Sequence, residues 1–225
     1  MPLNGQSAVD SLIGTADLGL IATYSYDAGG NREGEIASGV PAVVYHVDSL
    51  DRNVLQKFDR NGDGWLDFAI ARDKEPNSLY RNNHDGTFTD VAVEAGIAYG
   101  MNGTPRSGMG IDNADVTNTG RESILIGNLP TEGQALFTPD EGGHYTDTAD
   151  AAGLLAPSLP MSTFATLFLD YDGDGLKDCF AANGHVDETL HPGGEVTYQE
   201  TLLAFHNLGG GKFQQVGPEL VGQLT

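Results

Sequence analysis

A nine-residue acidic loop occurs twice in the chain, and this repeat constrains the fold more than any other feature of the sequence. Residues 59–67 (DRNGDGWLD) and 170–178 (DYDGDGLKD) share aspartate at the first, fifth and ninth positions and glycine at the fourth and sixth. A decayed copy, residues 115–123 (DVTNTGRES), lies between them. The first aspartates are therefore spaced by 56 and 55 residues. A fixed period of about this length is typical of a repeat protein.

Apolar segments flank the acidic loops and predict β-strands. After each loop an apolar stretch, a glycine-rich turn and an aromatic residue also occur in that order, as in a β-hairpin. One unit therefore consists of strand, acidic loop, strand, linker, strand, glycine turn and strand. Short helical turns are expected at residues 91–96 and 149–153. The expected strands lie at residues 68–71, 79–82, 88–90, 109–114, 124–127, 136–137, 145–147, 164–169, 179–182, 204–207 and around Phe213.

Four antiparallel strands in roughly 45–55 residues is the size of one β-propeller blade. The sequence lacks a convincing 3.6-residue apolar period, which argues against a parallel α/β fold. We therefore predict an all-β, propeller-type array of about four four-stranded blades. Residues 51–225 supply three of these blades, at about 51–104, 105–160 and 161–225. Residues 1–50, with strands expected at 18–26 and 42–47 around a turn at Gly29–Gly30, are interpreted as a divergent or incomplete blade.

The spacing of the loop residues predicts calcium sites. Oxygen-bearing side chains at alternate positions of a tight loop converge on one point, and a later carboxylate completes the ligand set. Such oxygen-rich, negatively charged ligands suit Ca²⁺ better than Zn²⁺. The twelfth position, where an EF-hand carries glutamate, is Ile70 or Ala181, so an EF-hand is excluded. The predicted ligands are Asp59, Asn61, Asp63, the Trp65 carbonyl and Asp67 at one site, and Asp170, Asp172, Asp174, the Leu176 carbonyl and Asp178 at the other.

The middle loop has lost most of these carboxylates. Asp115, Thr117, Thr119 and Ser123 offer one carboxylate and three hydroxyl groups, and Glu122 is one position out of register. We expect weak metal binding there or none, and so about two calcium sites per chain. The alternative for every loop is an acidic turn that is exposed to solvent and holds no metal.

The net charge of −21, from 32 acidic and 11 basic residues, bears on the choice of partners. Phosphate backbones are bound by clustered Lys and Arg, so nucleic acid is not an expected partner. No apolar stretch reaches about 18 residues, so membrane insertion is not expected. Cys179 is the single cysteine, which excludes an intrachain disulfide, and we expect it to be a small buried apolar residue. Residues 1–10 carry neither Lys nor Arg, so no signal peptide is expected in this chain.

The acidic loop, with Phe-Asp before it and Asp-Phe after it in residues 58–68, resembles the FG-GAP/VCBS repeats of integrin-like β-propellers. Residues 85–186 are similar to bacterial repeat proteins of the ASPIC/UnbV type, including residues 106–112 (RSGMGID) and 182–186 (ANGHV). The resemblance covers residues 58–216. It implies a propeller with calcium in its loops, an extracellular or periplasmic location, and a role in adhesion, ligand binding or scaffolding.

Two functions from different classes follow from these patterns. The first is a calcium-stabilised binding or scaffold module whose ligand is a small molecule, a glycan or a protein. The alternative is a calcium-dependent hydrolase of phosphotriesters, lactones or activated esters, in which Ca²⁺ acts as a Lewis acid. The resemblance implies that Arg106 and Asp112 lie on a strand lining a central channel, where a salt bridge or a solvated rim is the other interpretation. These two residues and His185 are the catalytic candidates.

The number of units also predicts assembly. Three intact units and one uncertain one give three to four blades, whereas a closed propeller needs at least about four. An open array would leave strand edges and apolar faces exposed, and proteins cover such surfaces. We therefore expect a homo-oligomer in which chains join edge to edge, unless residues 1–50 complete the ring.

Overall fold

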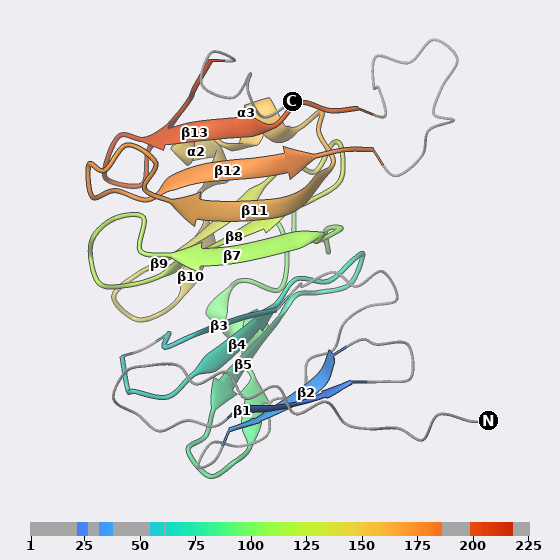
Figure 1. Cartoon of the computed structure of the whole chain (residues 1–225), viewed down its shortest axis with the longest axis vertical. Helices are drawn as coiled ribbons and strands as arrows, with labels where there is room; N and C mark the ends of the chain where they lie inside the picture. The colour runs from blue at the N-terminus through green and yellow to red at the C-terminus, as the bar shows by residue number, and fades with distance from the viewer. Residues whose placement is uncertain (1–21, 27–31, 38–54, 61, 186–198, 218–225) are drawn as a thin grey trace, which may run out of the picture. The chain divides into compact units, whose positions relative to one another are not determined.

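The computed structural model describes residues 22–26, 32–37, 55–60, 62–185 and 199–217 (Figure 1). The chain divides into two compact units, residues 1–53 and 54–225. In the described part of the first unit, β1 (Ala22–Tyr26) pairs with β2 (Arg32–Ala37) in an antiparallel ladder. The strand expected at 18–26 is confirmed over β1, and the one expected at 42–47 lies outside the described residues. The sequence did not predict β2, because its glutamates and glycine have low β-propensity and the pairing with β1 stabilises the strand.

The second unit contains three four-stranded antiparallel sheets, so the all-β prediction is confirmed. In each sheet, strands that are neighbours in sequence are also neighbours in space, and an acidic loop joins the first strand to the second. The first sheet consists of β3 (Leu55–Phe58), β4 (Asp67–Ile70), β5 (Ser78–Asn82) and β6 (Phe88–Asp90); the second of β7 (Gly110–Ala114), β8 (Ser123–Gly127), β9 (Ala135–Pro139) and β10 (Tyr145–Asp147); and the third of β11 (Thr163–Leu169), β12 (Asp178–Asn183), β13 (Leu203–Asn207) and β14 (Phe213–Gln215).

Three four-residue helical turns complete the described elements. Two of them, α1 (Ala92–Ala95) and α2 (Ala149–Ala152), confirm the turns expected after the first and second hairpins. Each ends at a glycine with positive φ, which is the common way to end a helix. The third, α3 (Leu155–Ser158), was not predicted from the sequence.

The second sheet lies between the other two sheets, and the burial of β8 shows this directly. All five residues of β8 are buried. Ile124 and Ile126 belong to the core cluster shared with the first sheet, whereas Leu125 belongs to the cluster shared with the third. Because successive side chains of a strand point to opposite faces, both faces of this sheet are covered. Cys179 lies in the second cluster and is fully buried, as the sequence predicts.

The first strands of the three sheets are neighbours, with β7 packed beside both β3 and β11. A β-carbon on Gly110 of β7 would lie 2.6 Å from the carbonyl oxygen of Phe164, so only glycine permits this approach. Farther along β7, the Asp112 carboxylate accepts a hydrogen bond of 2.7 Å from the backbone N–H of Phe168 on β11. This arrangement also brings the acidic loops near one another, since the Asn118 amide of the second loop donates to the Gly175 carbonyl of the third.

Candidate functional site

The first aspartate of each acidic loop folds the loop around its own carboxylate. Asp170 accepts hydrogen bonds from the backbone N–H groups of Gly173, Asp174 and Gly175, at 2.7, 3.1 and 2.9 Å. Asp59 makes the same three contacts in the first loop, at 2.8, 3.1 and 2.8 Å. Gly175 has a φ of 87°, a left-handed conformation in which glycine is not strained. The loop conformation therefore follows from the first aspartate and the glycine at the sixth position.

The ninth aspartate of the intact loops is buried and ties the loop to the third strand of its sheet. Asp67 accepts a hydrogen bond of 2.8 Å from the backbone N–H of Asn82, and Asp178 accepts one of 2.8 Å from that of Asn207. The second oxygen of Asp178 accepts from the N–H of Tyr171 at 3.1 Å. Burial raises the pKa of the Asp67 carboxyl, and the Asn82 N–H opposes this shift. These carboxylates therefore support the fold whether or not a metal is bound.

The second sheet lacks both partners of this contact. Ser123 occupies the ninth position there; it is fully buried, and its hydroxyl has no hydrogen-bond partner among the described residues. Pro139, which has no N–H group, stands where Asn82 and Asn207 stand in the other sheets. An aspartate at position 123 would have no backbone N–H to accept from at this place. The second sheet thus lacks both the ninth-position aspartate of the loop and the backbone N–H group on the third strand that this aspartate binds in the other two sheets.

The third loop brings its predicted ligands together. Asp170, Asp172 and Asp178 each offer a carboxylate oxygen, and these oxygens lie within 4.8 Å of one another. Such a set of oxygen donors fits Ca²⁺, which takes carboxylate and carbonyl ligands in a flexible geometry. In the first loop Asn61 lies outside the described residues, and the described aspartates there form no such triplet. The Trp65 and Leu176 backbones are held by N–H donation to Asp63 and Asp174, each at 2.8 Å.

Two histidines contact the acidic loops, although the sequence analysis did not select them. His206 Nδ1 lies 3.3 Å from Asp172 and 3.2 Å from Asp178, and it also groups with Asp172 and Asp174 within 4.8 Å. His84 Nε2 lies 2.9 Å from Asp63, and its ring stacks on Trp65 at 5.0 Å. Both histidines lie within two residues of the asparagines that bind the ninth aspartates. That proximity is the sequence signal that could have found them.

Two of the three catalytic candidates, Arg106 and Asp112, contact residues that support the fold. Arg106 precedes β7 instead of lying on it, and its guanidinium is 3.1 Å from Asp147 of β10, with both side chains largely buried. Asp112 lies on β7 as expected and holds β11 through Phe168. His185 is half-buried and immediately precedes residues outside the description. The expectation that Arg106 lies on the first strand is therefore wrong, because β7 begins only at Gly110.

Asp112 should make stability depend on pH. Burial raises the pKa of its carboxyl, and the N–H groups of Phe168 and Asn113 oppose this. A carboxyl with a raised pKa binds its proton more tightly in the folded state, so its ionised form destabilises the fold above that pKa. We expect Asp112→Asn, which keeps the acceptor oxygen, to be more stable than wild type at neutral pH. The difference should disappear as the pH falls below the ordinary aspartate pKa of 3.8. Urea unfolding at several pH values measures it, and a difference independent of pH would contradict the explanation.

One part of the chain is similar to a known repeat family. Residues 59–126 match the family model of the FG-GAP-like repeat. This segment is FG-GAP-like. It contains the first acidic loop, β4 to β7 and the beginning of the second repeat unit through Ile126 in β8.

A solved structure with partial likeness is that of an Agrocybe aegerita lectin, described as recognising non-reducing terminal N-acetylglucosamine. The identity is 17% and the TM-score 0.39, over 87% of this chain and 45% of that one. The chain thus spans less than half of that protein's length, and the likeness is too low to establish a shared fold. No curated protein matches the chain significantly. Within the described residues, no helix is long and apolar enough to cross a membrane.

Proposed function

We propose that this chain is a calcium-stabilised binding or scaffold module built from propeller-type blades. The observation that carries the proposal is the convergence of Asp170, Asp172 and Asp178 in the third loop. The FG-GAP-like match over residues 59–126 supports it independently, because that segment includes the other intact acidic loop. The meander order of each sheet and the neighbouring first strands are the arrangement that propeller blades have.

The contacts of the loops also favour a structural role for the cation. Each loop joins the first and second strands of its own sheet. A cation among the loop carboxylates would relieve the repulsion between them. The hydrolase alternative stays a prediction without a supporting contact, since Arg106 pairs with Asp147 and Asp112 accepts from Phe168. A binding or scaffold role requires no reactive group at the metal.

Calcium titration by isothermal calorimetry tests the proposal. We expect about two ions per chain, from the two intact loops. Asp172→Ala should remove one site, because Asp172 is exposed and its loss leaves the core intact. Asp63→Ala should remove the other, and Thr117→Ala in the decayed loop should leave the number of ions unchanged. Absence of saturable binding, or a stoichiometry that neither aspartate variant changes, would contradict the calcium assignment.

A further inference from the structure

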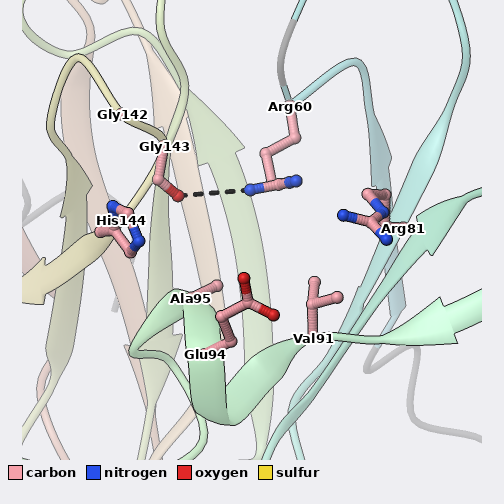
Figure 2. A pocket seen from close by; sticks show the side chains of 8 residues that line it. All are labelled: Arg60, Arg81, Val91, Glu94, Ala95, Gly142, Gly143 and His144. Atoms are coloured by element: carbon pink, nitrogen blue, oxygen red, sulfur yellow. Dashed lines mark hydrogen bonds between the residues drawn. The ribbon is translucent and has the colours of Figure 1, made fainter.

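A cavity of about 170 Å³ lies between the first and second sheets and is lined mainly by charged and polar groups (Figure 2). The first acidic loop, β5 and α1 contribute residues from the first repeat, and the turn between β9 and β10 contributes the others. Figure 2 shows the Glu94 carboxylate directed toward Arg60, and Arg81 on the opposite side of the cavity from His144. The lining residues are Arg60, Arg81, Val91, Glu94, Ala95, Gly142, Gly143 and His144.

Arg60 is held in place before any ligand arrives. Its Nε lies 3.3 Å from Asp67, and its Nη1 donates to the Gly143 carbonyl at 3.2 Å. The side chain is only 12% exposed. A guanidinium fixed from two sides offers its remaining N–H groups at little cost in conformational entropy.

Arg81 and Glu94 carry opposite charges into the same cavity. Both are exposed, and neither has an ion-pair partner among the described residues. The whole chain has 11 basic residues against 32 acidic ones, so two arginines at one cavity are a local concentration of positive charge. The charge of Arg60 is balanced by Asp67, which leaves Arg81 and Glu94 available for a ligand that carries both charges.

The internal repeat shows that packing between sheets does not require these charges. At the equivalent place between the second and third sheets, Val116 replaces the first arginine and is fully buried. There Lys212 spans the gap and donates through Nζ to the Ala151 carbonyl at 2.7 Å. The same packing thus forms without the two arginines and the glutamate, with Lys212 as the one charged group among the equivalent residues. The equivalent pairs are Arg60 and Val116, Arg81 and Thr138, Glu94 and Ala151, and His144 and Lys212.

We propose that this cavity binds a small zwitterion with a carboxylate beside a protonated amine, such as an α-amino acid with a short side chain. Arg81, with Arg60 beside it, takes the carboxylate, because guanidinium groups match carboxylate geometry. Glu94 takes the amine, and it repels an anion that lacks one. Val91 and Ala95 provide the apolar contact for the side chain. The inference rests on the proposed binding function. Arg60 contacts Asp67, a predicted calcium ligand of the first loop, so the binding is measured in saturating calcium.

Calorimetric titration of the full chain with three probes in saturating calcium tests the inference. We expect L-alanine to bind at least about tenfold more tightly than acetate or ethylammonium, each of which carries only one of the charges. Arg81→Gln should reduce alanine binding to the level of ethylammonium, and Glu94→Gln should reduce it to the level of acetate. The matched controls, Arg72→Gln and Glu75→Gln, change an exposed ion pair of the same unit that does not line the cavity, and should bind alanine as wild type does.

Three results would overturn the inference: no saturable binding of alanine, equal binding of all three probes, or alanine binding that neither cavity variant weakens. Failure here is separable from failure of the proposed function, because the number of bound calcium ions is measured in a different titration. Circular dichroism of each variant confirms that the protein is folded before the titration is interpreted.

Discussion

Excess chelator will lower the melting temperature of this protein by on the order of 10–20 °C. Each intact loop gathers several carboxylates, and their mutual repulsion opposes folding unless a cation lies among them. When free calcium is well above the dissociation constant, each occupied site adds roughly 2–4 kcal/mol to the free energy of unfolding. Two sites therefore give the largest effect that we expect for any single change of conditions. Differential scanning calorimetry with and without chelator measures this effect.

Variants of the acidic loops show how much of the stabilisation by calcium comes from each site. Asp63→Ala and Asp174→Ala should each remove about half of the difference between the calcium and chelator curves, because each leaves one intact loop. Thr117→Ala is the matched control in the decayed loop, and its difference should equal that of wild type. Identical melting curves of the wild-type protein with and without chelator would show that calcium does not stabilise the fold.

Asp178→Ala will lower the free energy of unfolding by about 4 kcal/mol even in chelator. The substitution leaves the buried N–H of Asn207 and the partly buried N–H of Tyr171 without their acceptor, and an unsatisfied buried donor costs about 1–3 kcal/mol, a partly exposed one less. Chemical denaturation in chelator measures this loss without any contribution from metal binding. Asp178→Asn should lose less, since its amide oxygen still accepts from one of the two donors.

Ser123→Ala provides the matched control in the second sheet. The serine occupies the same loop position and is equally buried, but its hydroxyl has no hydrogen-bond partner among the described residues. Its removal should change stability by less than about 0.5 kcal/mol or stabilise the protein slightly. Equal losses for Asp178→Ala and Ser123→Ala would show that the backbone contacts of Asp178 do not stabilise the fold.

Short-range patterns were sufficient to predict most of the second unit. Alternating apolar segments, glycine turns and the repeated loop predict all of its strands except β3 within a few residues, because strand and turn preferences depend on neighbours in the chain. The conformation of the acidic loop is equally local, since Asp170 binds N–H groups only three to five residues away. The homo-oligomer and the blade boundaries stay predictions.

The position of Arg106 relative to β7 was predicted wrongly, and the partner of Arg106 is distant in the sequence. Its side chain pairs with Asp147, which lies 41 residues later in the sequence. The family resemblance that placed Arg106 on the first strand carries no information about such a partner. The same holds for β2, whose polar composition does not predict a strand and whose pairing with β1 stabilises one.

The sequence by itself determined the repeat, the all-β class and the aspartates that are candidates for calcium. Only the tertiary structure showed that Asp178 is buried against Asn207, that His206 contacts the third loop, and that Arg60, Arg81 and Glu94 line one cavity with the turn at Gly143. The physical reason is sequence separation. Loops and strands form from contacts within a few residues, whereas Arg60 meets Gly143 across 83 residues, through the packing of one sheet on the next.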